Sequence, residues 1–112
     1  MLVGYADKSV QKLCENEKEA VKKLGMPLAK KLFQRMEWIS NAETLSVLNT
    51  EHNTLRIHRL AGNYEGCYAL DLDARNRLIF YPCDEEGEFI EEPHFENITV
   101  ITVEEVSKHY GD

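Results

Sequence analysis

Apolar residues recur at roughly helical spacing through the N-terminal third of the chain, with lysine and glutamate between them. Residues 1–5 can form a short strand before this pattern begins. Asp7 or Ser9 can then cap a helix by accepting a backbone N–H bond. Gly25 can take the left-handed conformation that ends a helix, so the pattern predicts one helix that reaches Leu24.

A second helix is predicted directly after Gly25, because Pro27 suits the first turn of a helix. The link between the two helices is short, so they are expected to be antiparallel neighbours in a helical hairpin. Residues 42–48 are expected to form a short helical turn or a packed connection. The apolar positions of the second helix are Leu28, Leu32, Phe33, Met36 and Ile39.

The pattern changes to a period of two after the polar loop at residues 49–54, which predicts strands in place of helices. Pro82 is expected to close the last of these strands, because proline has no N–H to donate to a sheet. The predicted strands are residues 55–60, 67–73 and 77–81, joined by turns at residues 62–66 and 73–76.

The C-terminal part of the chain adds one more strand. Residues 98–103 are β-branched and apolar, as in a buried strand. Thr102 with Glu105 matches a capping box, so a short helix is expected from about Val103 towards His109. The elements together predict an α+β fold in a single domain of residues 1–112. The helical hairpin is expected to pack on one face of a mostly antiparallel sheet of about four strands, which leaves the other face free for a ligand.

Length and cysteine content limit the class of protein. A chain of 112 residues suits one domain, and it contains no apolar run of about 18 residues that would span a membrane. The first residues lack the basic and apolar regions of a secretory signal. Three widely spaced cysteines fit a reducing cytoplasm better than a disulfide scaffold. No Cys-x-x-Cys pair occurs, so a structural zinc site is not expected. No metal or other cofactor is expected either.

The net charge of −7 and the pI of about 5.1 argue against a nucleic-acid binder, which is normally basic. The charge is uneven, however, and it is the local field that steers an anion. From Arg56 to Arg77 four arginines stand with three acidic residues. Residues 84–92 are strongly acidic and are expected to form a solvated loop. The alternatives are that this segment repels ribosomal RNA or contacts a basic partner.

A series of short motifs runs in order along nearly the whole chain. They are Lys23-Leu24-Gly25 with Leu28-Ala29-Lys30-Lys31-Leu32, Ala42-Glu43-Thr44-Leu45, His58-x-Leu60-x-Gly62, Gly66-x-Tyr68-Ala69-Leu70 and Arg77-Leu78-Ile79-Phe80. In this order they resemble the RelE/ParE toxin superfamily, and most of all its HigB-type branch of plasmid maintenance system killer proteins.

The resemblance implies a RelE-like fold and the toxin of a type II toxin–antitoxin system. Such a toxin is a ribosome-dependent, metal-independent mRNA endoribonuclease that inhibits translation in the cytoplasm. The implied partners are the ribosome with its mRNA and a cognate helix-turn-helix antitoxin, HigA-like, with which the toxin forms a hetero-oligomer. Two alternatives stay open. One is a ParE-like toxin that inhibits DNA gyrase, and the other is a catalytically weakened relative that binds its antitoxin and acts as a co-repressor.

The resemblance also implies which residues are functional. His58 stands where such toxins carry a functional histidine, Arg77 opens the R-x-I-F strand, and His109 corresponds to the histidine near the C-terminus. Two positions depart from the family pattern. Ala61 stands where this branch often has lysine, and Tyr110 follows the histidine that a tyrosine usually precedes.

Side-chain chemistry gives the same three residues a role in RNA cleavage. Attack by a 2′-hydroxyl needs a base and an acid, and histidine suits both because its pKa lies near neutral. Arginine suits the phosphate because it can donate two parallel charge-assisted hydrogen bonds. Each residue also has a structural alternative: a lone hydrogen bond for His58, an ion pair with Asp71 or Asp73 for Arg77, and a frayed terminus for His109.

Further arginines and tyrosines are candidates for contacts with RNA. Tyrosine rings stack on unpaired bases, as in readers of single-stranded RNA. Tyrosines at strand spacing also serve as packing residues, and packing is the expected role of Tyr68. The candidates are Arg56, Arg59 and Arg75 for phosphate and Tyr64, Tyr68, Tyr81 and Tyr110 for bases.

Overall fold

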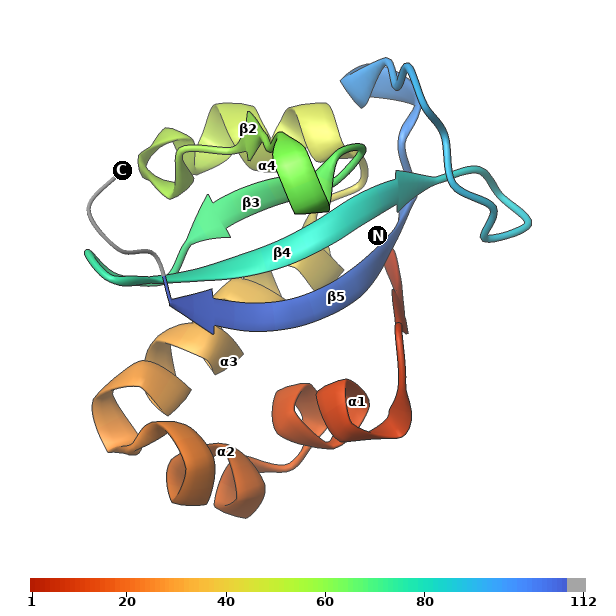
Figure 1. Cartoon of the computed structure of the whole chain (residues 1–112). Helices are drawn as coiled ribbons and strands as arrows, with labels where there is room; N and C mark the ends of the chain where they lie inside the picture. Colours follow the sequence, from red (N-terminus) through yellow and green to blue (C-terminus); the bar gives the residue numbers. More distant parts are fainter. Residues whose placement is uncertain (109–112) are drawn as a thin grey trace.

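The computed structural model describes residues 1–108, which combine helices with a mixed five-stranded sheet (Figure 1). The chain therefore has the α+β class that the sequence predicts. The α-helices are α1 (Lys8–Glu15), α2 (Glu17–Leu24), α3 (Met26–Asn41) and α4 (Leu45–Glu51). The strands are β1 (Leu2–Tyr5), β2 (His58–Arg59), β3 (Tyr68–Asp71), β4 (Asn76–Cys83) and β5 (Val100–Lys108).

The predicted first helix is wrong in one respect, because it is divided into α1 and α2 at Asn16. Asp7 caps α1 as expected, with the N–H of Val10 donating to its Oδ1 at 2.9 Å. Asn16 has extended backbone (φ −115°, ψ 108°), and its Oδ1 accepts a 3.0 Å hydrogen bond from the N–H of Glu19. An asparagine side chain that satisfies a backbone donor in this way starts a new helix in place of continuing the old one.

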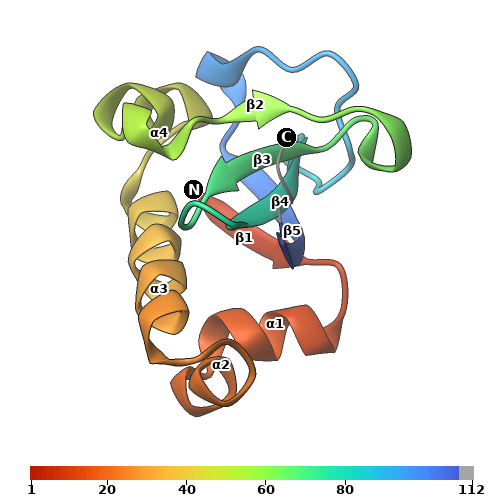
Figure 2. The same cartoon turned by 60° about the vertical axis from the view of Figure 1, so that its left-hand side comes forward.

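The remaining helix boundaries follow the sequence signals. Gly25 ends α2 with a φ of 84°, a conformation that costs glycine little. Pro27 lies in the first turn of α3, as predicted. The short helix expected around residues 42–48 is α4, which Thr44 caps by accepting from the N–H of Val47 at 3.2 Å. Figure 2 shows α3 running alongside the sheet, with α1 and α2 at one end of it.

The strand order is β1-β5-β4-β3-β2, and β1 pairs with β5 in parallel while the other neighbours are antiparallel. The sheet is thus larger than the four strands predicted, and it is mixed. A parallel pair needs a long crossover, and here most of the chain lies between the two strands. The pairing brings Leu2 opposite Val100 and Tyr5 opposite Val103.

The predicted C-terminal helix is wrong, because residues 100–108 continue as strand β5. This strand lies between β1 and β4 and forms hydrogen-bonded ladders with both. Val103 is fully buried in the core and Val106 packs against it, as their β-branched side chains favour. A capping box stabilises a helix by only about 1 kcal/mol, which is less than two ladders and this apolar burial provide.

The strand predicted at residues 55–60 is mostly wrong, because only His58–Arg59 pairs with β3. Leu55 belongs to a 3₁₀ turn, Asn53–Leu55, and its side chain is fully buried in the core. Arg56 then adopts a left-handed conformation with φ 52°, so the chain cannot run extended through this point.

Pro82 lies inside β4 and does not close it, because the strand continues to Cys83. The pairing of β3 with β4 ends at Tyr68 opposite Phe80, so residues after Phe80 have β5 on one side and no β3 partner on the other. Proline is tolerated at such a local edge, where its missing N–H removes no ladder bond.

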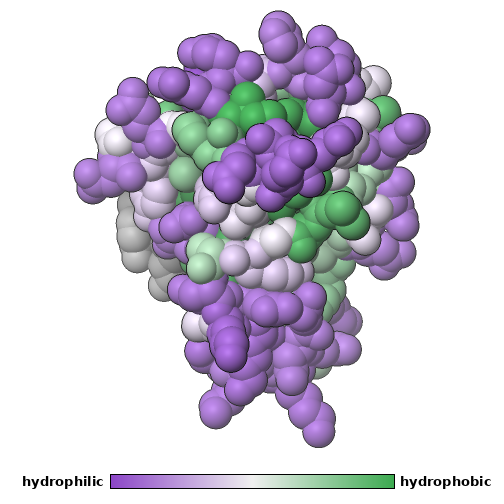
Figure 3. All heavy atoms as spheres, turned by 90° about the vertical axis from the view of Figure 1, so that its right-hand side faces the viewer, coloured by the Kyte–Doolittle hydropathy of each residue, from purple (hydrophilic) through white to green (hydrophobic). Residues whose placement is uncertain are grey.

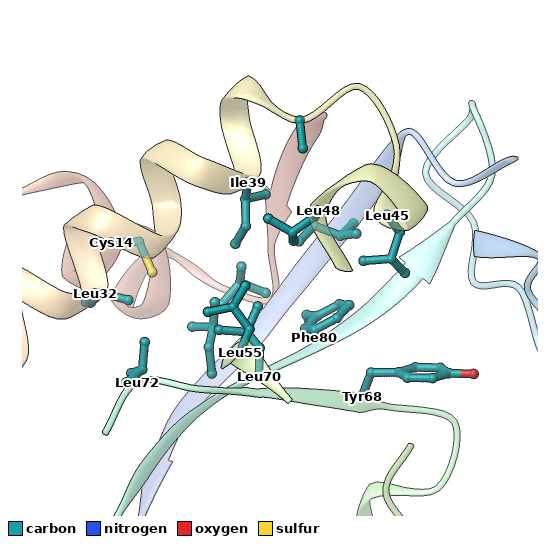
Figure 4. Close-up of a cluster of buried hydrophobic side chains, with 14 of the residues drawn as sticks. Cys14, Leu32, Ile39, Leu45, Leu48, Leu55, Tyr68, Leu70, Leu72 and Phe80 are labelled. Atoms are coloured by element: carbon teal, nitrogen blue, oxygen red, sulfur yellow. The ribbon is translucent and has the colours of Figure 1, made fainter. Parts of the chain in front are cut away.

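The core lies between the helices and one face of the sheet (Figure 4). Ile39 of α3 and Leu45 and Leu48 of α4 point towards Phe80 of β4. All four side chains are completely buried. Leu32 of α3 extends the same cluster, so the helical layer covers this face and leaves the opposite face for other contacts.

Two surface properties complete the fold. In residues 1–108 the helices are all too short or too polar to cross a membrane. On the side that Figure 3 shows, hydrophilic side chains cover the α1–α2 end, and hydrophobic side chains are exposed between hydrophilic ones in the upper half. Leu2 and Phe89 are among the exposed large apolar residues.

Asp73 closes the turn between β3 and β4. Its Oδ1 accepts hydrogen bonds from the backbone N–H groups of Arg75 and Asn76, each at 2.8 Å. Burial alone would raise the pKa of Asp73, but these bonds and one from the Asn76 side chain lower the pKa overall. The turn predicted at residues 73–76 is thereby confirmed, with the mechanism expected of an aspartate at a turn.

Asp73→Ala is expected to lower the free energy of unfolding by about 1 kcal/mol at neutral pH, because two backbone donors lose their acceptor. Since the folded pKa is depressed, this advantage of the wild type is complete above the unfolded value of about 3.9 and is lost as the pH falls through the folded pKa. Urea unfolding from neutral pH to about pH 2 measures the difference, with exposed Glu43→Ala as control. A difference that stays constant with pH would contradict this account.

Candidate functional site

The open face of the sheet is the face away from the helical layer. Along β4, Leu78 and Phe80 point into the core, so Arg77 and Ile79 face the other way. In the register, Arg77 lies between Asp71 of β3 and Ser107 of β5. Basic, acidic and hydroxyl side chains therefore form a row across three strands of this face.

Tyr64 covers part of the open face from the turn that follows β2. The turn contains a 3₁₀ helix, Gly62–Tyr64, and brings the Tyr64 ring centroid to 6.0 Å from the guanidinium carbon of Arg77. A hydrogen bond with Glu105, together with partial burial and the charge of that carboxylate, raises the pKa of Tyr64. Ser107 and Arg77 oppose this rise. Tyr64, Arg77, Glu105 and Ser107 thus form one contact group.

A β-bulge explains why two glutamates lie near this group. The register between β4 and β5 shifts between Ile79 and Phe80, where Glu105 pairs with Ile79 and Val103 pairs with Phe80. Glu104 is the extra residue, and bulges commonly redirect a side chain in this way. Burial first, and then the charges of Glu104 and Glu105, raise the pKa of the Cys67 thiol. The two carboxylates therefore make the surroundings of the Cys67 thiol more negative.

His58 lies on β2, at the far edge of the same sheet. Its Nδ1 is 2.6 Å from the carbonyl oxygen of Arg56, and a carbonyl can only accept, so this nitrogen carries the proton. The neutral ring then has its lone pair on Nε2, which is the form a general base requires. His58 pairs with Ala69, and Ala69 pairs with Ile79 beside Arg77 on β4.

Arg56 forms an ion pair with Asp71, the residue opposite Arg77 in the ladder between β3 and β4. Arg56 Nε lies 2.8 Å from Asp71 Oδ2. Arg56 therefore reaches the same row of side chains as Arg77, from the edge next to β2.

Arg59 and Arg75 lie apart from this row. The Arg59 guanidinium donates to the carbonyl of Glu91 at 2.7 Å, is 3.9 Å from a Glu92 oxygen, and lies over the Tyr68 ring at 5.8 Å. Tyr68 itself is a core residue, as expected. Arg75 is exposed in the β3–β4 turn. His109 and Tyr110 lie outside the described residues.

Glu105 and Ser107 are site residues that the sequence patterns missed. Both were assigned to a helix by the capping box, in which they would not share a face with Arg77. In a strand, residues two apart project to the same side, so Glu105 and Ser107 both face Tyr64. The β-branched side chains of Val103 and Val106 favour a strand. Their spacing of three residues suits a helix, and only the bulge at Glu104 brings both valines to the core face of the strand.

The arrangement can bind an anion and move a proton. The Arg77 guanidinium offers charge-assisted hydrogen bonds to a phosphate, and His58 Nε2 can accept a proton. The strands β2 and β4 are two spacings apart, about 10 Å, and His58 is opposite Ile79 and not Arg77, so the two side chains do not contact each other. Ala69 and Ile79 lie between them on this face and are completely buried. In the part of the chain that the structure describes, no cluster of His, Cys, Asp and Glu could hold a metal ion.

No protein-family model matches this chain, and no curated protein sequence matches it. The geometry of the open face and the ordered motifs of the sequence are therefore the grounds for assigning a function.

Glu105→Gln is expected to lower the pKa of Tyr64 towards its ordinary value of about 10, because the carboxylate that favours the protonated phenol is removed. Ser107→Ala should have the opposite effect, since the Ser107 hydrogen bond favours the phenolate. NMR titration of ¹³C-labelled tyrosine measures the pKa, and Tyr64→Phe assigns the resonance. If neither variant moves the resonance, this contact group does not exist in solution.

Proposed function

We propose that this protein is the toxin of a type II toxin–antitoxin system and that it cleaves mRNA on the ribosome. The observation that carries the proposal is the Arg77 guanidinium beside the Tyr64 ring, on a sheet face that the helices leave open. The motif series from Lys23 to Phe80 supports the same assignment through its resemblance to RelE/ParE toxins. The proposal includes a RelE-like fold and a single domain that covers residues 1–112.

The proposed reaction is attack by a ribose 2′-hydroxyl on the adjacent phosphorus. His58 Nε2 takes the proton from the hydroxyl, and the new oxygen–phosphorus bond forms as the bond to the 5′-oxygen breaks. His109 returns a proton to that leaving oxygen. The products are a 2′,3′-cyclic phosphate and a free 5′-hydroxyl, so protons and bonds balance without a metal or other cofactor. Arg77 stabilises the charge that builds on the phosphate oxygens.

Single-stranded RNA suits the surroundings of Arg77. The Tyr64 ring can stack on an unpaired base next to the bound phosphate. Arg56 at the β2 edge, Arg75 in the turn and Tyr110 near the C-terminus are proposed to contact the neighbouring nucleotides. Arg59 belongs to the same proposed set, although its guanidinium is held by Glu91 and Glu92.

The proposal includes partners and location. A toxin that acts on the ribosome works in the cytoplasm, with mRNA and the ribosome as its targets. Its activity must be controlled, and the proposed controller is a helix-turn-helix antitoxin, HigA-like, in a hetero-oligomer with the toxin. A small reading frame for such an antitoxin directly beside this gene would support the assignment.

A second candidate function rests on the carboxylates of the open face. Glu105 contacts Tyr64, Glu104 lies near Cys67, and the charge of both opposes a bound phosphate. The net charge of −7 adds to this opposition. These observations favour a catalytically weakened relative, which binds its antitoxin and acts as a co-repressor.

Arg77→Ala is expected to reduce mRNA cleavage by about 100-fold or more and to relieve growth arrest, because it removes the cation that stabilises the transition state. His58→Ala should reduce cleavage by about 100-fold as well, through loss of the base. Primer extension on mRNA from expressing cells measures the breaks. Lys12→Ala on α1 is the matched control, since it removes an exposed cation from the helical layer.

Three outcomes separate the candidate functions. Site-specific breaks that disappear in Arg77→Ala support the nuclease. Growth arrest with poisoned gyrase and intact mRNA would indicate the ParE-like alternative. Unaffected growth with retained antitoxin binding would indicate the co-repressor. Full toxicity in both the Arg77 and the His58 variant would show that the active residues lie elsewhere.

Glu105→Gln is expected to tighten binding of a single-stranded RNA oligonucleotide by about two- to fivefold at low salt, because one opposing charge is removed. The exposed Glu85→Gln, with the same change in net charge, is the control. Fluorescence anisotropy at several salt concentrations measures the affinity. Equal affinities for the wild type and both variants would remove the support for a weakened nuclease.

A further inference from the structure

A hollow of about 420 Å³ lies beside the open face, between the turn after β2 and the acidic segment after β4. Tyr64 forms its border with the contact group of Arg77. Its walls combine two kinds of side chain, aromatic rings and carboxylates. The rings are those of Tyr64, Tyr81 and Phe89, and the carboxylates are those of Glu65, Glu88 and Glu104.

The aromatic wall is held in place by close packing. The rings of Tyr81 and Phe89 meet edge to face, with centroids 6.0 Å apart and planes at 80°. Gly66 lies under the Phe89 ring with a φ of 89°, and a Cβ at this position would come within 2.8 Å of Phe89 Cζ. Only glycine allows this approach, because a side chain would push the ring away. Phe89 nevertheless stays 48% exposed, so its ring is accessible to a ligand.

The charge of the hollow is negative throughout. Its ten lining residues include no lysine, arginine or histidine. The nearby thiols respond to this charge: after burial, the charges of Asp84 and Glu88 raise the pKa of Cys83, as Glu104 and Glu105 do for Cys67. Within residues 1–108 no carboxylates gather closely enough to hold a metal ion. An extended organic cation therefore fits the hollow better than a metal.

The chain itself shows how such a surface is occupied. On the other side of Phe89 lies a second hollow, lined by Arg59, Glu91 and Glu92. There the chain's own arginine bonds to the Glu91 carbonyl, approaches the Glu92 carboxylate and lies over the Tyr68 ring. Aromatic ring, carboxylate and guanidinium thus already combine once in this region. The first hollow offers other rings and carboxylates of the same kinds. Its lining residues include no cation, although Arg77 lies 6.0 Å from the Tyr64 ring at its border.

We infer that the hollow between Tyr64, Tyr81 and Phe89 binds an arginine or lysine side chain of a partner protein. A ring face attracts a guanidinium or ammonium group, and three carboxylates supply charge-assisted acceptors around it. A protein partner is favoured over a free amine because the acidic surface continues beyond the hollow to Glu91 and Glu92, where it can meet further basic residues. The inference uses neither Arg77 nor His58 and shares only Tyr64 with the proposed RNA contacts.

The test is an NMR titration of the full, ¹⁵N-labelled chain with the tripeptide acetyl-Gly-Arg-Gly-amide. Saturable shifts are expected at Gly66, Glu88 and Phe89. The same peptide with citrulline, which keeps the shape but loses the charge, should leave these resonances unchanged. n-Butylamine is titrated in parallel as a free amine with the same single positive charge.

Two variants locate the binding. Phe89→Leu and Glu88→Gln should each weaken the tripeptide by roughly two- to fivefold, which is the effect of losing one cation–π or charged contact at an exposed site. Glu85→Gln, on the same acidic segment but outside the hollow, should bind as the wild type does. Glu88→Gln keeps the test decisive if Phe89→Leu fails to fold.

Several results would overturn the inference. If Glu85→Gln weakens tripeptide binding as much as Glu88→Gln does, the peptide responds to the net charge of the protein and not to the hollow. Binding of the citrulline peptide would exclude recognition of a cation. Tighter binding of n-butylamine than of the tripeptide at the same residues would indicate a small amine in place of a partner protein.

Discussion

The ladder between β4 and β5 determines both faces of the molecule. On the helical side it presents Phe80 and Val103 to α3 and α4, and the buried area there stabilises the fold. On the other side it carries Arg77 and Glu105, which contact Tyr64. The bulge opposite Ile79 and Phe80 affects both faces, because β5 there has one extra residue, Glu104. The extra residue lets Val103 and Val106 both face the core, and it adds a second glutamate next to Glu105.

Local signals in the sequence predict those parts of the fold that short-range interactions decide. Asp7, Gly25 and Pro27 mark helix boundaries through backbone hydrogen bonds and allowed dihedral angles, and each acts in the structure as expected. The predictions fail where contacts between distant segments determine the secondary structure. Residues 100–108 form a strand because they pair with β1 on one side and β4 on the other, and the local sequence carries no information about these partners. Leu55 is apolar and was predicted to lie in a strand, but it belongs to a 3₁₀ turn and its side chain is buried there.

The same division applies to the candidate site. Arg77 was selected through the resemblance to RelE/ParE toxins and the affinity of arginine for phosphate. The structure locates it beside Tyr64, a residue proposed only for base stacking. Glu105 and Ser107 were missed because their position depends on strand β5, and the capping box predicted a helix for these residues. The net charge of −7 also has a role in positioning arginines. Arg56 pairs with Asp71, and Arg59 bonds to the Glu91 carbonyl and lies near the Glu92 carboxylate. Some of the acidic residues therefore hold the chain's own cations in place.

The parallel pairing of β1 with β5 has a consequence for folding. The two strands lie far apart in the sequence, so their pairing closes a long loop and is expected to form late. Glu105 and Ser107 reach Tyr64 only when β5 has joined β4. The surroundings of Arg77 therefore depend on contacts that local segments of the chain cannot form by themselves.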